Sequence, residues 1–313
     1  MRPRILLLAV LALSLGMVAG PASGKVVQRV VHSAGFVEPH TPGSGAPDEV
    51  PAGARIEALL GAPVDLNQVT TVRTNWEGAR RPKVVLILIP GFLGGATTLD
   101  PIARDLVRSF RGELEVWAVD RRPNQLEDRL GAQYAFAGAE APGCGTSPPA
   151  PDCSIFEGAQ FYFPDSNLRP LDDFPGPGDL DLDLDGVFDA QLPLTDRFGT
   201  TRGPLFFSQD ELRFFAHWGV DTYFRDWKLL VEEARRRVTP AGVVLLGGHS
   251  QGTTWSALYA AYDFDPDPGR VDAGHAGIDG LVLLEGGGAG TGSATKPTLV
   301  EYQARVSALE TPG

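Results

Sequence analysis

Cysteine, histidine and positive charge are scarce in this chain of 313 residues. It has two cysteines and five histidines, and 27 Lys and Arg against 39 Asp and Glu leave a formal net charge of -12 at pH 7. So acidic a chain repels phosphate backbones at long range, which argues against a nucleic-acid partner. The cysteines, Cys144 and Cys153, lie close together in a proline-rich stretch. In an oxidising compartment we expect them to form a local disulfide, with two free thiols as the alternative.

The N-terminal apolar run, residues 5–18, is shorter than the ~20 residues that a membrane span requires. Arg2 and Arg4 precede it, and small residues follow at 22–24. This pattern predicts a signal peptide over residues 1–24, and an uncleaved N-terminal anchor is the alternative. We therefore expect an exported protein, secreted or periplasmic, with no stable membrane span after cleavage.

The full chain is 43% hydrophobic, which is enough for one large core. Buried strands are predicted at 83–90, 114–119, 243–246 and 278–284, with helical patterns between them. Such long crossovers predict a mostly parallel α/β sheet with helices on both faces. We divide the chain into a lead-in with edge strands at 25–82, core segments at 83–130 and 229–313, and a lid-like insertion at 131–228.

The most informative motif is Gly248-His249-Ser250-Gln251-Gly252, between a predicted buried strand and a predicted helix. A G-x-S-x-G turn in this context projects its serine from the sheet edge as a nucleophile, and Gly248 and Gly252 would avoid clashes there. A serine that merely caps a helix is the alternative. On this motif the chain resembles the α/β-hydrolase superfamily, and secreted bacterial lipases and esterases in particular.

The resemblance implies further site residues. The oxyanion donors would be the backbone N–H groups of Gln251 and of Phe92, the latter in a glycine-rich loop that could also be a structural turn. Glu285, at the end of the fourth strand, matches the position of the triad acid. Asp120 is a weaker candidate for that role.

A catalytic histidine is missing from the place where the resemblance puts it, because no histidine follows Glu285. His249 adjoins the nucleophile, and His217 and His275 are weak substitutes. We expect a C-terminally incomplete chain that lacks the final strand or strands and the histidine loop.

The predicted insertion contains Asp181, Asp183 and Asp185, spaced like the first half of a calcium loop. The twelfth position of that loop is Leu192 instead of glutamate, which favours a solvated acidic loop over a metal site. Aromatic residues of the insertion, among them Phe214 and Trp218, would line an acyl pocket or form core.

Together these features predict a serine hydrolase that cleaves a small-molecule or lipid ester through an acyl-enzyme on Ser250, without a cofactor. A catalytically inactive protein that keeps the fold to bind a ligand or partner is the alternative.

Overall fold

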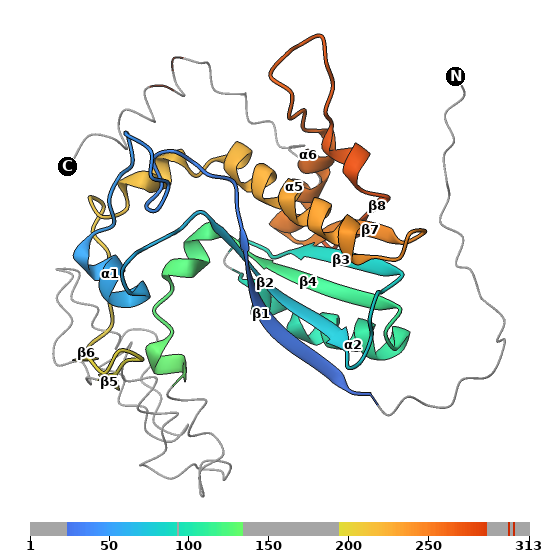
Figure 1. The fold of residues 1–313 in the computed structure, drawn as a ribbon, viewed down its shortest axis with the longest axis horizontal. Coiled ribbons are helices and arrows are strands. Elements are labelled where there is room, and N and C mark those ends of the chain that lie inside the picture. The colour runs from blue at the N-terminus through green and yellow to red at the C-terminus, as the bar shows by residue number, and fades with distance from the viewer. Residues whose placement is uncertain (1–23, 93, 134–193, 287–299, 301–302, 304–313) are drawn as a thin grey trace, which may run out of the picture.

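A computed structural model of the chain describes residues 24–92, 94–133 and 194–286, together with residues 300 and 303. Its centre is a six-stranded sheet in the order β1-β2-β4-β3-β7-β8 (Figure 1). The strands are β1 (Val26–Ala34), β2 (Gln68–Trp76), β3 (Val84–Ile89), β4 (Leu114–Asp120), β7 (Val243–His249) and β8 (Gly280–Leu284). Strands β4, β3, β7 and β8 are parallel, whereas β2 pairs antiparallel with both β1 and β4. The sheet is therefore mostly parallel, as predicted.

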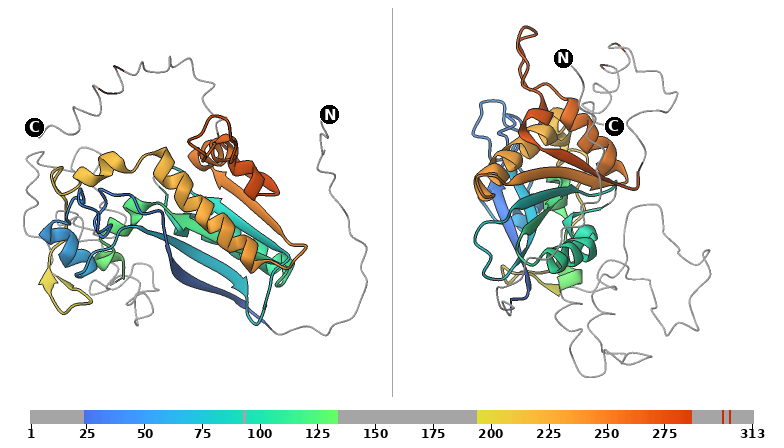
Figure 2. Two further views of the ribbon diagram at one scale, coloured as in Figure 1. Left: turned by 45° about the horizontal axis from the view of Figure 1, so that its top comes forward. Right: turned by 90° about the vertical axis from the view of Figure 1, so that its right-hand side faces the viewer.

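Helices cover both faces of this sheet (Figure 2). One face carries α2 (Asp100–Phe110), and the opposite face carries α5 (Val220–Arg237) and α6 (Gln251–Ala261). The smaller elements are α1 (Ala54–Leu60), the 3-10 helices η1 (Ala96–Leu99), η2 (Arg122–Leu126), η4 (Arg213–His217) and η5 (Gly274–Gly277), and the short strands β5 (Leu194–Thr195) and β6 (Thr201–Arg202).

The alternation of side chains along β3 explains why its sequence is uninterruptedly apolar. Leu86 and Leu88 pack in one cluster with α2, while Val85, Ile87 and Ile89 pack in the other with α5 and α6. Each such fully buried aliphatic side chain contributes about 1.5–3 kcal/mol relative to an exposed one. Burial on both faces thus confirms the prediction from the apolar run, and it makes β3 a rigid support for the loop that follows it.

A third apolar cluster joins the lead-in to the segment before α5. Ile56 and Leu66 pack there against Leu126, Phe214 and Trp218, all of which are buried. Phe214 and Trp218 are therefore core residues, the second of the two interpretations that the sequence left open.

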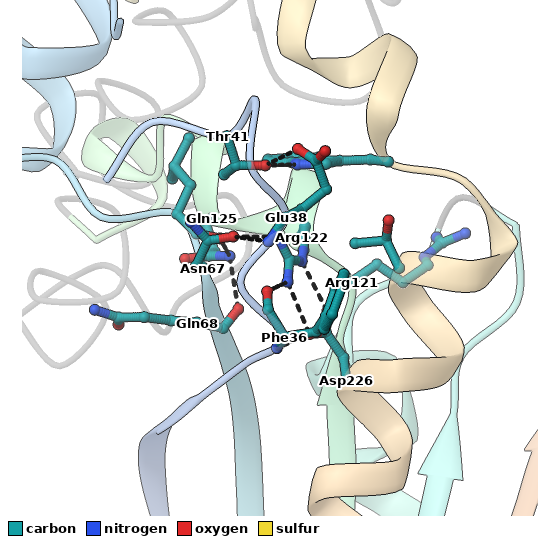
Figure 3. A network of polar contacts seen from close by, with 12 residues as sticks. Phe36, Glu38, Thr41, Asn67, Gln68, Arg121, Arg122, Gln125 and Asp226 are labelled. Atoms are coloured by element: carbon teal, nitrogen blue, oxygen red, sulfur yellow. Dashed lines mark hydrogen bonds and ion pairs between the residues drawn. The ribbon is translucent and has the colours of Figure 1, made fainter. Parts of the chain in front are cut away.

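A buried ion pair lies next to this cluster (Figure 3). The Arg122 guanidinium donates to both carboxylate oxygens of Asp226, at 2.8 Å each, and to Asn67 Oδ1 at 2.9 Å. It also donates to the Phe36 carbonyl, while Phe36 N donates to Asp226 at 2.8 Å. Because the side chains of Arg122 and Asp226 are only 1% and 3% exposed, the pair fixes the lead-in, η2 and α5 relative to one another.

Among the helices that the structure describes, none combines the length and apolarity needed to cross a bilayer. The predicted signal peptide falls outside the described residues except for Gly24. Export therefore stays a prediction.

Candidate active site

Ser250 occupies a sharp turn between the end of β7 and the start of α6. Its backbone angles are φ 54° and ψ -120°, a left-handed conformation that a residue with a Cβ atom rarely adopts. Such strain costs on the order of 1–3 kcal/mol and persists only where the surrounding packing imposes it. The side chain is exposed. The turn therefore presents a strained, accessible serine at the carboxyl end of a central parallel strand.

The two motif glycines are required by close backbone packing around this turn. A Cβ atom on Gly248 would lie 2.4 Å from the carbonyl carbon of Gly252. A Cβ atom on Gly252 would lie 2.2 Å from the Ile89 carbonyl oxygen, at the end of β3. Both separations are far below van der Waals contact, and the neighbours are backbone atoms that cannot rotate away. The strand-turn-helix context predicted for Ser250 is thus confirmed, and so is the mixed α/β class with a mostly parallel sheet.

The loop after β3 lies against the serine. A Cβ atom on Gly91 would stand 3.2 Å from Ser250 Cβ, so the loop backbone passes directly beside the exposed side chain. Among the described residues, no partner accepts a hydrogen bond from the backbone N–H of Phe92 or of Gln251. Gln251 is the first residue of α6, where N–H groups have no intrahelical acceptor. Both predicted oxyanion donors thus belong to segments that flank Ser250.

Arg121 ties these two segments together, and the sequence analysis did not identify it. One guanidinium nitrogen donates to the carbonyls of Gly91 at 3.0 Å and Gly94 at 2.9 Å, and also to that of Phe92. The other terminal nitrogen lies 3.5 Å from Gln251 Oε1. Burial lowers the pKa of Arg121, but a guanidinium titrates so far above neutrality that it keeps its charge. Its position directly after β4, at the carboxyl edge of the sheet, is the signal by which it could have been found.

Asp120 has a structural role on the same loop. Its carboxylate accepts a hydrogen bond from Ala96 N at 2.6 Å, and Arg129 lies 3.5 Å away. Burial raises the pKa of this carboxyl, although the Ala96 bond and Arg129 oppose the shift. Asp120 and Arg121, which are adjacent in sequence, therefore both hold the loop after β3. Asp120 binds it at Ala96, and Arg121 binds it between Gly91 and Gly94.

Glu285 stands beside the serine through its main chain. Ser250 N donates to the carbonyl of Glu285 at 2.7 Å and to that of Leu284 at 3.3 Å. Glu285 is exposed and adopts a positive φ of 33°. The end of β8 is thus in contact with the turn, and the role of the Glu285 carboxylate as triad acid stays a prediction.

All five histidines lie in the described part of the chain, and none is hydrogen-bonded to the Ser250 hydroxyl. His32 contacts Thr70 Oγ1 at 2.9 Å, and His275 contacts the Ala260 carbonyl at 3.2 Å. His40 and His217 stack on each other with ring centroids 3.7 Å apart. His249 is exposed at the end of β7. His217 and His275 therefore contact other groups, and His249 makes no hydrogen bond to the serine.

Other predicted sites lie outside the described residues. These are the disulfide between Cys144 and Cys153, the acidic loop with Asp181, Asp183 and Asp185, and most of the lid-like insertion.

No protein-family model matches the sequence, and no curated protein matches it. Among solved structures, the fold is similar to a "Bacterial Heroin Esterase" at 15% identity and a TM-score of 0.31, covering 79% of this chain and 42% of that one. It is similar to a putative lipase from Sulfolobus solfataricus at 13% identity and a TM-score of 0.41, covering 90% and 52% respectively. A third structure, titled a novel bacterial esterase, matches at 13% identity and a TM-score of 0.30, covering 95% and 86%. The chain thus spans about half the length of the first two, and likenesses this distant transfer no activity.

Proposed function

We propose that this protein is a serine hydrolase that cleaves carboxylic esters through an acyl-enzyme on Ser250. The observation that carries the proposal is the strained backbone of Ser250. The turn is packed so closely that a Cβ atom at Gly248 or at Gly252 would clash with backbone atoms. A serine that only caps a helix adopts extended backbone angles and turns its hydroxyl onto the helix. Ser250 has a positive φ, and it makes no side-chain hydrogen bond to the first turn of α6. The geometry therefore favours a nucleophile over a cap.

In the proposed reaction the Ser250 hydroxyl oxygen attacks the ester carbonyl carbon, and its proton passes to a base. The negative charge on the carbonyl oxygen is stabilised by the N–H groups of Phe92 and Gln251. The positive end of the α6 dipole lies at the same point and acts in the same direction. The carbonyl bond re-forms, the alcohol leaves with the proton, and water releases the acid by the same steps.

The substrate class that we propose is a small-molecule or lipid ester, handled by an exported enzyme. An exposed serine at a sheet edge suits such a substrate, and the net charge of -12 disfavours a polyanion. Glu285, whose main chain contacts Ser250, is the proposed acid that orients the base.

A fluorophosphonate probe tests the proposal because it labels only serines that are activated as nucleophiles. If the chain supplies a base to Ser250, the purified protein is labelled at Ser250, as located by mass spectrometry, and hydrolyses a p-nitrophenyl ester. Ser250→Ala should abolish both signals, while Ser109→Ala, at an exposed serine of α2, should change neither.

A second function is favoured by one observation, namely that no histidine of the chain is hydrogen-bonded to Ser250. A fold that keeps the turn without an activating base would bind a ligand and not turn it over. Folded protein that takes no label would show that Ser250 is not activated in this chain. That result fits the binding function, and it also fits a hydrolase without its catalytic histidine, as we expect from the sequence.

A further inference from the structure

Apart from Ser250, the described residues bring together a second group of chemically active side chains. Glu38 and His40, from the lead-in, meet His217, from η4. One ligand atom from each of the three lies within 4.8 Å of the other two. About 180 residues of sequence separate the two histidines, so only the tertiary fold assembles the group. We propose that these three residues form a binding site for a divalent transition-metal ion, with Zn²⁺ as the best fit.

Both ring nitrogens of His40 face carboxylate oxygens. Its Nδ1 lies 2.9 Å from Glu38 Oε1, and its Nε2 lies 3.1 Å from Asp48 Oδ2. A neutral imidazole has one N–H, so it can donate to only one of these carboxylates. The other nitrogen is satisfied in two ways only, by a second proton, as in the imidazolium, or by a bound cation. A metal ion bound by His40 Nδ1 and Glu38 Oε1 is the second of these arrangements, and it takes the place of the proton on Nδ1.

Asp48 and Thr41 supply the outer contacts that such a site requires. Asp48 accepts from Nε2 of His40 and so selects the tautomer in which Nδ1 is free to bind metal. Thr41, which is fully buried, donates to Glu38 Oε2 at 2.8 Å and leaves Oε1 for the ion. Figure 3 shows Thr41 beside the Glu38 carboxylate. Trp218 Nε1 donates to the Thr41 hydroxyl at 2.7 Å. The carboxylate is thereby held by a buried chain of donors.

Two imidazoles and one carboxylate are ligands typical of Zn²⁺, with water as a fourth. Tetrahedral bonds of ~2.0–2.1 Å place ligand atoms about 3.3 Å apart, so His40 Nδ1 and Glu38 Oε1, which lie 2.9 Å apart, have to separate by about 0.4 Å to admit the ion. The two rings are stacked, with planes 8° apart. One ring therefore tilts on binding, because each lone pair has to aim at the ion. The bound ion would cross-link the lead-in to the segment that precedes α5.

Zinc binding to the full chain without an affinity tag tests this site. After dialysis against a chelator, we expect titration calorimetry to show one Zn²⁺ per chain and no comparable uptake of Mg²⁺. His217→Ala and His40→Ala should abolish that uptake. His32→Gln, a histidine on β1 outside the group, should leave it unchanged. Added Zn²⁺ should also raise the Tm of the wild type, because a ligand that binds only the folded state stabilises it.

Asp48→Asn is the most specific variant, because Asp48 is exposed and its loss should not impair folding. Loss of an outer-shell carboxylate typically weakens metal affinity about 10- to 100-fold, and we expect this range. If His217→Ala is unfolded, His217→Gln and Asp48→Asn still test the site. Folded wild-type protein without bound zinc, or equal uptake by all variants, would overturn the proposal and leave a hydrogen-bonded cluster. Ser250→Ala should bind zinc normally, so the result is independent of the proposed hydrolase activity.

Discussion

The Ser250 turn and the polar cluster around Arg122 are built in opposite ways. The turn comes from five consecutive residues, and its shape depends on backbone atoms and the absence of Cβ atoms. The cluster comes from side chains of the lead-in, η2 and α5, which are far apart in sequence. One region exposes a serine side chain at the cost of backbone strain, and the other buries charges that neutralise each other. Local sequence can specify the first, whereas the second exists only in the folded chain.

The largest effect that separates the two regions should be on activity. Replacing Ser250 with Ala removes the attacking oxygen, and we expect the rate of ester hydrolysis to fall at least about 1,000-fold. The thermal midpoint should stay within a degree or two, because the backbone angles are unchanged. Steady-state assays and calorimetry on both proteins check this, and a large loss of stability would show that the serine is structural.

The largest effect on stability should come from Asp226→Ala. It leaves the Arg122 guanidinium buried without its counter-charge, and such losses cost about 3–5 kcal/mol. Urea denaturation measures the change. Asp105→Ala breaks an exposed pair with Arg108 and serves as the control, with an expected cost below about 1 kcal/mol. Equal effects of the two substitutions would contradict the contrast between buried and exposed charge.

Arg121→Met should reduce activity with little change in stability, which distinguishes it from Asp226→Ala. The variant keeps the aliphatic stem but loses the bonds to Gly91, Phe92 and Gly94 that position the loop after β3, which is the proposed oxyanion loop. Misplacing a reacting geometry by an ångström costs about 100-fold, and we expect kcat to fall by that factor with KM nearly constant. A fall confined to KM would mean that Arg121 binds substrate instead of positioning the loop.

The smallest effect concerns pH and the ion pair of Glu233 with Arg73. Burial tends to raise the pKa of Glu233, but the bonds and charge of Arg73 outweigh it, so the net pKa lies below its ordinary value of 4.5. A lowered folded-state pKa gives stability that is present above pH 4.5 and is lost as the pH falls through the lowered value. Glu233→Gln should therefore destabilise the protein by about 1 kcal/mol at neutral pH and by less in acid. Denaturation midpoints at several pH values test whether the difference narrows.

Prediction from sequence succeeded where the pattern is short-range. The apolar run of β3 indicated burial on both faces, and G-x-S-x-G in its strand and helix context indicated the turn at Ser250. It failed to identify Arg121, because an arginine after a strand has many possible partners. Nor did it pair Arg122 with Asp226 or His40 with His217, since nothing in the linear order relates them.

By itself, then, the sequence determined the strands, the class of sheet and the position of the strained serine, because these depend on periodicity and on steric limits of neighbouring residues. The tertiary structure alone decided which loop lies against that serine, which guanidinium holds the loop, and which histidines meet Glu38. Such contacts join residues that are far apart in the sequence, so they form only when strands, helices and loops have packed around both faces of β3.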